Sequence, residues 1–403
     1  MKKNLIILLL ISIVSFISIK SASAQTAYDP VRHCYIDEST DECIPNTILS
    51  ALPFLRIVPD ARGAALGDAG IAISADPSAM HFNAAKLAMS EKEFELSTTY
   101  TPWLKNLGLN DIYLAYLSGY NKFDKIQAIG YSIRYFSLGE LEYRNNTGDI
   151  TGTGNPAEFE VALSYARKLS NRFSAGLTGK FVYSNLAVGQ RVDGIAIESA
   201  KSFAIDISLF HKTKFNLGGY KTKLNTGLTI SNIGSPITYT KSTDKDFLPQ
   251  NLGLGTSLDM QFDDYNSISF ILDFNKLLLP TPVLQKDSSG TLRYIKFDGS
   301  PINAALHSFT DAEGGLTEEL REISTSVGVE YWYDKQFAIR AGYFYEHPLK
   351  GDRQFLTLGL GLNYNVYGMS ISYLVPTNNT RNPLDGTLRF SFSMDFTKEK
   401  FKE

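Results

Sequence analysis

The sequence has 403 residues but only two cysteines, no excess of positive charge and few long apolar runs. After residue 24 no stretch approaches the ~18 consecutive apolar residues of a membrane-spanning helix, which excludes a helical membrane protein. Lys+Arg 39 against Asp+Glu 42 gives a net charge of −3, so the chain offers no basic footprint for nucleic acid. A hydrophobic content of 43% with 20% charged residues excludes a disordered chain.

Motifs for cofactor, metal or enzymatic chemistry are also missing. Gly-rich phosphate loops, zinc spacings and Gly-x-Ser-x-Gly do not occur, and the acidic pairs lack the spacing of an EF-hand. Nucleophilic catalysis needs a base held beside its nucleophile, and no such constellation can be read from the histidines. We therefore predict no catalytic, cofactor-binding or metal-binding residues and a protein that is not an enzyme. The histidines are His33, His81, His211, His307 and His347.

Residues 1–24 have the pattern of a secretory signal peptide. Lys2 and Lys3 precede an apolar run, and Ala22-Ser23-Ala24 supplies a small-residue cleavage site. An anchor helix is the alternative, but the apolar run is too short to span a bilayer. We expect an exported protein that begins at Gln25. The only cysteines, Cys34 and Cys43, then lie in an oxidising compartment, so we predict that they form a local disulfide.

What the chain does have is 12% aromatic residues and a repeating period of two from Phe94 onward. In the final example, apolar residues from Leu388 to Phe396 alternate with Arg389, serines and Asp395. Most of the strands that this alternation predicts are about ten residues long, which is the length of a tilted membrane-crossing strand. The fourteen predicted strands are 94–101, 112–119, 126–136, 157–167, 173–185, 201–210, 222–232, 250–262, 265–275, 322–333, 336–347, 354–363, 366–375 and 387–396.

The connections distinguish a membrane barrel from a soluble sandwich, which also shows alternation. Every link from an odd to an even strand is long or moderate, whereas the even-to-odd links are tight, with an exception near 211–221. Such sorting of loops by parity is typical of outer-membrane barrels. We predict an all-β transmembrane barrel of fourteen antiparallel strands over 94–396, with the short turns and both ends of the mature chain in the periplasm. Residues 397–403 would be a periplasmic tail.

The two faces of these strands support the same interpretation. One face carries Leu, Ile, Phe and Tyr, as contact with lipid requires, and the other carries small, polar and charged residues. Closure of the sheet would pair every backbone group within the hydrocarbon layer. Charged residues expected to face the lumen are Arg134, Glu160, Lys180, Asp206, Asp273 and Arg340.

The N-terminal segment 25–93 differs, because residues 60–90 are rich in Gly and Ala. Such a stretch can pack closely against other backbone, which suits a plug, or hatch, inside the barrel. A solvated periplasmic tail is the alternative, but the composition is too apolar for it. The hatch residues that we single out are Gly63, Gly67, Asp68, Gly70, Asp76 and Asn83.

A resemblance to a known family enters at this segment. The fourteen strands with an N-terminal hatch resemble the FadL-type outer-membrane transporters. Within them, the run from Leu52 through Asp60-Ala-Arg-Gly-Ala-Ala-Leu-Gly-Asp-Ala-Gly to His81-Phe-Asn-Ala-Ala resembles the PorV (LptO) group of the type IX secretion system. One departure is Asn83-Ala84-Ala85, where the family usually has Asn-Pro-Ala.

The resemblance implies a non-enzymatic role in protein secretion at the outer membrane. Its partners would be the large translocon barrel of the type IX system, secreted cargo with C-terminal secretion domains, the surface attachment complex and outer-membrane lipid. Two alternatives remain open: a FadL-like transporter of hydrophobic compounds, and a protein linked to lipid A deacylation. No cofactor and no nucleic acid are implied.

The loop over 276–321 is much longer than two antiparallel strands need, and long loops are usually functional or disordered. We expect a short helix near 311–323 and an exposed apolar patch that binds a partner. The alternative is a loop that folds over its own barrel mouth. The residues predicted to form the patch are Leu277, Leu278, Leu279, Pro280 and Pro282.

Overall fold

The computed structural model describes residues 26–37, 40–104, 109, 111–144, 147–192, 195–241, 245–286, 292–295, 297–378 and 386–397. The expected signal peptide and all but the first residue of the expected C-terminal tail lie outside these ranges. The chain divides into two compact units, Met1–Pro45 and Asn46–Glu403. Among the described residues, no helix has the length and apolar character needed to cross a membrane.

The first unit is a small three-stranded antiparallel sheet, made of β1 (Thr26–Asp29), β2 (Cys34–Asp37) and β3 (Glu42–Ile44). Cys34 and Cys43 are joined by a disulfide that ties β2 to β3, which confirms the predicted pairing. Nearby, Arg32 bridges the carboxylates of Asp29 and Asp41.

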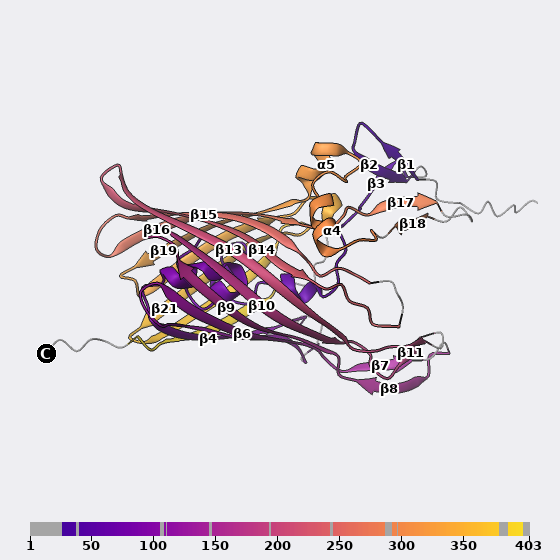
Figure 1. Cartoon of the computed structure of the whole chain (residues 1–403), viewed down its shortest axis with the longest axis horizontal. Coiled ribbons are helices and arrows are strands. Elements are labelled where there is room, and N and C mark those ends of the chain that lie inside the picture. The colour runs from indigo at the N-terminus through magenta and orange to yellow at the C-terminus, as the bar shows by residue number, and fades with distance from the viewer. Residues whose placement is uncertain are drawn as a thin grey trace, which may run out of the picture. The chain divides into compact units, whose positions relative to one another are not determined.

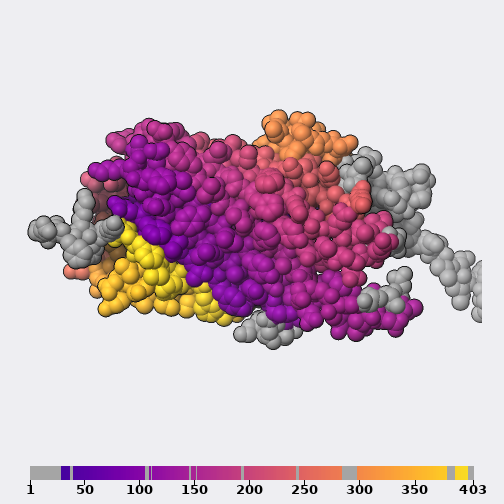
Figure 2. Space-filling model, turned by 60° about the horizontal axis from the view of Figure 1, so that its bottom comes forward, coloured from indigo at the N-terminus to yellow at the C-terminus, as the bar shows by residue number. Residues whose placement is uncertain are grey.

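The second unit is a closed barrel of fourteen antiparallel strands (Figure 1). Each strand pairs with its neighbours in chain order, and the last strand closes the barrel against the first, with Phe390 opposite Tyr100. Figure 2 shows this closure as the yellow C-terminal strand beside indigo N-terminal strand residues. The strands are β4 (Phe94–Pro102), β5 (Ile112–Lys122), β6 (Gln127–Leu138), β9 (Ala157–Lys168), β10 (Phe173–Asn185), β13 (Ala200–Leu217), β14 (Tyr220–Gly234), β15 (Asn251–Gln261), β16 (Asn266–Leu277), β19 (Ile323–Tyr333), β20 (Phe337–Tyr345), β21 (Gln354–Tyr364), β22 (Tyr367–Pro376) and β23 (Leu388–Asp395).

These strands confirm the predicted barrel and the sorting of its connections by length. The expected exception near 211–221 is wrong: β13 and β14 continue through it and meet in a turn at Gly218-Gly219, with Leu217 opposite Tyr220. Both glycines have positive φ, 61° and 91°, which the tight turn requires. All links of one end are therefore short turns.

The strands separate apolar and polar residues as the alternation predicts. Leucines, isoleucines, valines and aromatics of the outer face are exposed, as contact with hydrocarbon requires. The six charged residues expected in the lumen are all buried there. The largest fully buried side chains include Arg134, Arg340 and Arg389, so the lumen is filled with protein.

We call the end of the barrel that carries the long loops the outer end. Some short elements lie in these loops, and others form the segment inside the barrel. The outer-end loops contain β7 (Leu141–Arg144), β8 (Ile150–Gly154), β11 (Arg191–Val192), β12 (Ile195–Ala196), β17 (Val283–Lys286), β18 (Leu292–Ile295), α4 (Pro301–His307), α5 (Gly315–Arg321) and η4 (Pro348–Lys350). The inner segment contains η1 (Pro53–Arg56), α2 (Ala61–Ala64), α3 (Ala79–Phe82) and η2 (Ala84–Met89).

The chain enters and leaves the barrel unit at opposite ends. Asn46 donates its backbone N–H to the carbonyl of Leu349 in an outer loop, 3.1 Å away, whereas Phe396 pairs with Phe94 at the end with short turns. Our expectation that both ends would lie beside the short turns is therefore wrong. The segment that begins at Asn46 crosses the lumen before strand β4 begins. Because of this crossing, the barrel unit starts at the outer end.

Candidate functional site

Residues 46–93, the hatch, fill the lumen by close contact between backbones. A Cβ added to Gly342 of β20 would lie 2.1 Å from the Gly67 nitrogen and from the Leu66 carbonyl carbon. Gly67 itself has φ of 69°, a conformation that favours glycine. Small residues on both sides therefore let the hatch touch the wall of the barrel.

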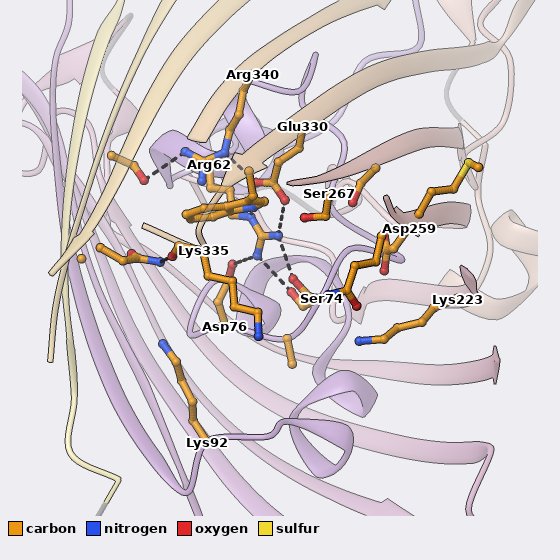
Figure 3. Close-up of a pocket in the computed structure, with 18 of the residues that line it drawn as sticks. Arg62, Ser74, Asp76, Lys92, Lys223, Asp259, Ser267, Glu330, Lys335 and Arg340 are labelled. Atoms are coloured by element: carbon orange, nitrogen blue, oxygen red, sulfur yellow. Dashed lines mark hydrogen bonds and ion pairs between the residues drawn. The ribbon is translucent and has the colours of Figure 1, made fainter. Parts of the chain in front are cut away.

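Arg62 of α2 links the hatch to the wall by charge. Its guanidinium donates to both carboxylate oxygens of Glu330 on β19, at 2.9 and 2.7 Å, and to Asp76 of the hatch at 2.7 Å. Arg340 of β20 donates to the same Glu330 carboxylate at 2.7 Å. Figure 3 shows these side chains converging from the hatch and two strands. The two arginines balance the two carboxylates, as a buried ionic cluster requires.

A second anchor comes from Asp273 of β16. One of its carboxylate oxygens accepts the backbone N–H groups of Gly70 and Ile71, at 2.7 and 2.9 Å. On the hatch side, the buried Lys86 amine donates to the Gly70 carbonyl at 2.5 Å. Burial lowers the pKa of Lys86 to about 8. The turn at Gly70 is thus held from both sides by charged groups.

Arg134 of β6 fixes the part of the hatch nearer the outer end. Its guanidinium donates to the carbonyls of Phe54 and Leu55, each at 3.1 Å, and lies 2.8 Å from Nδ1 of His81. Burial first, and then the positive charge of Arg134, hold the pKa of His81 well below its usual value. A neutral imidazole accepts a hydrogen bond from arginine, so this pair is structural.

Below the hatch, at the end with short turns, lies a cavity of about 870 Å³ that we call the vestibule. Its lining combines hatch residues Arg62, Ser74 and Asp76 with the ends of the strands. Figure 3 shows the amines of Lys92, Lys223 and Lys335 reaching into this space. The volume is in the range of ligand-binding cavities.

A smaller cavity of about 120 Å³ lies on the outer side of the hatch. It is lined by Arg56, Asp68 and His81 of the hatch, by Asn275 of the wall and by Lys350 of an outer loop. The hatch separates the two cavities, so the described residues form a plugged barrel.

The segment Leu277–Pro282 does not form the exposed patch that the sequence suggested. Leu277, Leu278 and Leu279 are buried, Leu279 to 2% exposure, and Leu277 and Leu279 pack with Ile48 of the hatch. That expectation is wrong because the loop turns back over the mouth and covers its own leucines. Whether this segment contributes to binding a partner stays a prediction.

A buried ionic cluster, the latch, holds the loop in this position. Lys276 of β16 contacts Glu319 and Glu322 at 2.8 and 2.5 Å, and Lys350 of η4 contacts Glu318 and Glu322 at 2.6 and 3.0 Å. Thr281 adds a hydrogen bond to Glu322 at 2.7 Å. The latch thus joins α5 to a strand end and to another outer loop.

The loop does present an apolar surface, but on its two helices. Ile302 and Leu306 of α4 are exposed, as are Leu316 and Leu320 of α5, with Leu316 at 75% exposure. Each pair has i, i+4 spacing and so lies on one side of its helix. These four residues are the outer apolar face. The sequence signal for this face is the i, i+4 spacing of its apolar residues.

The predicted hatch residues all lie in the plug, where they have different tasks. Gly63 and Gly70 make room for the ring of Phe82, because a Cβ on either would lie within 2.5 Å of it. Asn83 donates to the carbonyls of Ile71 and Leu209, at 3.1 and 3.0 Å. Asp68 is half-buried; burial raises its pKa, and Arg389 opposes that rise.

The sequence did not identify the partners of these residues. Arg62, Lys86 and Glu330 are central to the plug but carry no local signal, because their contacts join segments far apart in the chain. The alternation did place Asp273 and Arg340 on the polar face.

Apart from His81, the histidines of the barrel unit have local contacts. His211 lies 3.3 Å from the Thr213 hydroxyl, His307 lies 3.7 Å from Asp311, and His347 accepts the Leu349 N–H at the start of η4. Within the described ranges, no three His, Cys, Asp or Glu residues are grouped to hold a metal ion.

Comparison with known families supports the fold. A family model described as type IX secretion system protein PorV matches residues 39–284. No curated protein matches the chain.

Solved structures similar to this chain include toluene transporters and a FadL homologue. The toluene transporter TbuX of Ralstonia pickettii has a TM-score of 0.50 and 13% identity, over 84% of this chain and 98% of that chain. The toluene transporter TodX of P. putida has a TM-score of 0.48 and 13% identity, over 84% and 99%. A FadL homologue of Pseudomonas aeruginosa has a TM-score of 0.43 and 12% identity, over 87% and 100%. At these identities, the similarity to TbuX shows the fold alone.

Proposed function

Because the chain belongs to the PorV family of type IX secretion system proteins, we propose that it is the plugged barrel that carries secreted cargo between two assemblies. It would associate with the large translocon barrel, receive cargo by its C-terminal secretion domain and pass it to the surface attachment complex. The family makes it an outer-membrane barrel of that secretion system; the shuttle and its partners are our proposal.

The outer apolar face is the observation that carries this proposal. Ile302, Leu306, Leu316 and Leu320 expose large side chains at the end of the barrel where the long loops lie. An isolated exposed leucine needs no explanation, but two helices with paired apolar residues mark a protein contact. The latch keeps α5 in place, so the face is presented by an ordered loop.

The plug supports the same function. A pore that conducts solutes needs an open lumen, whereas here Arg62 and Asp273 hold the hatch against the wall. The outward apolar side chains of the barrel would contact outer-membrane lipid.

Purification of the tagged protein from native membranes tests this function. We expect a very large barrel and secreted proteins with a shared C-terminal domain to be recovered together. Recovery of neither, from membranes in which both are present and the tagged barrel is folded, would contradict the proposal.

The two cavities favour one second candidate, a FadL-like transporter of hydrophobic compounds. Transport would require the hatch to move, so that the vestibule and the cavity of about 120 Å³ become one path. Uptake of a labelled hydrocarbon by vesicles that contain the purified protein would support this candidate, and uptake equal to that of empty vesicles would contradict it.

A further inference from the structure

Strand β13 extends beyond its neighbour at the end with short turns. Pairing with β10 ends where Phe173 lies opposite His211, followed by one bond from Lys212 N–H to the Arg172 carbonyl at 2.8 Å. Residues Thr213–Leu217 continue to pair with β14 on their other side. At about 3.4 Å per residue, roughly 17 Å of strand edge is left over, and none of the strands in the described ranges pairs with it.

The same hairpin concentrates positive charge on one face. Lys214 of β13 lies directly opposite Lys223 of β14, and Asn216 lies opposite Lys221. Lys214, Lys221 and Lys223 all line the vestibule, and Lys212 shares the face of Lys214. Like charges placed opposite one another in a sheet are destabilising.

Lys223 lies opposite Asp259 of β15, but no carboxylate lies opposite Lys214 or Lys221. Lys212 and Lys223 approach the exposed Glu91 carboxylate only to 4.0 and 3.9 Å. Across the described part of the chain, no carboxylate lies within 4.0 Å of the Lys214 or Lys221 amine. Residues that break a local rule without a compensating contact are expected at functional sites.

The edge and the charge together define the occupant. A second copy of this edge would bring lysines opposite lysines, which is how such edges avoid self-association. A small anion would neutralise the amines but leave the edge-facing backbone N–H and C=O groups of Lys214 and Asn216 without partners. An extended acidic polypeptide satisfies both, because its backbone adds a strand and its carboxylates face the lysines.

We propose that the free edge of β13 binds an acidic, extended segment of a partner protein as an added strand. On the other face of β13, Phe215 and Leu217 are exposed. The segment that fits best therefore alternates acidic residues with apolar ones. The barrel layout places this site on the periplasmic side.

A fluorescent peptide of alternating Asp and Val tests the proposal with the full-length barrel in detergent. We expect saturable binding that weakens with salt, and slower hydrogen exchange of the Lys214 and Asn216 amides in the complex. Lys214→Glu with Lys221→Glu should weaken binding at least about tenfold, because two attractions become repulsions. The matched control is Lys125→Glu with Lys241→Glu, which makes the same charge change elsewhere and should bind as the unchanged protein does.

Three results would overturn the proposal, provided that heat-modifiable mobility shows all variants folded. One is equal affinity of the Lys214→Glu, Lys221→Glu protein and its control. Another is peptide binding without slower exchange at Lys214 and Asn216. The third is binding of inorganic phosphate or of phosphatidylglycerol vesicles when the peptide does not bind, which would make the hairpin a site for small anions or lipid.

Discussion

Arg62 of the hatch and Glu330 of β19 form a two-point ion pair, with Nε–Oε2 and Nη2–Oε1 distances of 2.9 and 2.7 Å. The two residues are 268 positions apart, so this contact exists only when the hatch lies inside the closed barrel. Arginine binds a carboxylate at two points with fixed geometry. The pair therefore sets the position of the hatch as well as its stability.

Replacement of Glu330 should loosen the hatch. Glu330→Gln removes the charge shared by Arg62 and Arg340, so Arg340 loses its carboxylate partner and Arg62 keeps only Asp76, at a cost of about 3 kcal/mol or more. We expect faster hydrogen exchange over residues 60–76 and larger ion conductance in planar bilayers. Glu140→Gln, at an exposed loop position, is the control. Equal conductance and exchange in the two variants would show that the ion pair does not hold the plug.

The contact between Gly342 and the hatch predicts a steric effect. Gly342→Ala places a methyl group 2.1 Å from the hatch backbone, which must shift. Overpacking of this kind costs about 1–3 kcal/mol. Gly179→Ala is the matched control, because a Cβ there meets no atom within 4 Å. Thermal denaturation should show a lower midpoint for Gly342→Ala alone; the same midpoint for both would contradict the close approach.

The latch predicts a protease-sensitive loop when it is broken. Lys350→Met leaves Glu318 and Glu322 with fewer partners at a buried site, which costs about 3 kcal/mol. Limited proteolysis of intact cells should then cleave the loop between 297 and 322 faster. Lys241→Met changes an exposed lysine and should leave the rate unchanged. If the loop of the Lys350→Met protein resists the protease as before, its packed leucines hold it over the barrel mouth without the latch.

Asp60, which caps α2 by accepting the Gly63 N–H at 2.8 Å, predicts a dependence on pH. Burial, and then the charge of Asp76, raise the pKa of Asp60 from 3.8 to about 6. The folded hatch therefore binds more protons than the unfolded one between these values. The stability that protonated Asp60 contributes is fully present below about pH 4 and is lost as pH rises through 6. The loss is about 1.4 kcal/mol for each unit by which the pKa is raised.

Asp60→Asn should remove this dependence and keep the cap, because an amide oxygen also accepts the N–H bond. Hydrogen exchange of residues 61–71, measured from pH 4 to pH 7 and corrected for intrinsic rates, gives the local free energy of opening. Asp264→Asn, on an exposed turn, should keep the slope of the unchanged protein. If the free energy of opening still depends on pH in the Asp60→Asn protein, another group causes that dependence.

The barrel could be predicted from the sequence because a strand in a bilayer must alternate lipid-facing and lumen-facing residues. The alternation failed as a guide near Lys212–Lys223, where β13 runs past its neighbour β10 and carries lysines. Lysines and the Gly218-Gly219 pair then looked like a loop, although they belong to a hairpin.

The site was harder to predict because its contacts are distant in sequence. Composition indicated a plug, and Gly67 indeed touches the backbone of β20. Nothing near Arg62 in the chain points to Glu330, and nothing in Leu277-Leu278-Leu279 shows that a folded loop covers them. Helical spacing at Leu316 and Leu320 could have identified the apolar face.

Substitution of the outer apolar face tests the proposed shuttle most directly. Removing the whole loop would also remove Glu318 and Glu322 of the latch, so we would change only Leu316→Ser and Leu320→Ser, with Leu141→Ser and Ile150→Ser in another outer loop as the matched control. The measurement is recovery of the large translocon barrel with the tagged protein from native membranes, at equal levels of folded barrel. We predict that recovery falls at least tenfold for the α5 variant and stays unchanged for the control, since burial of two leucines contributes about 3 kcal/mol or more. Undiminished recovery with Leu316→Ser and Leu320→Ser would contradict the account.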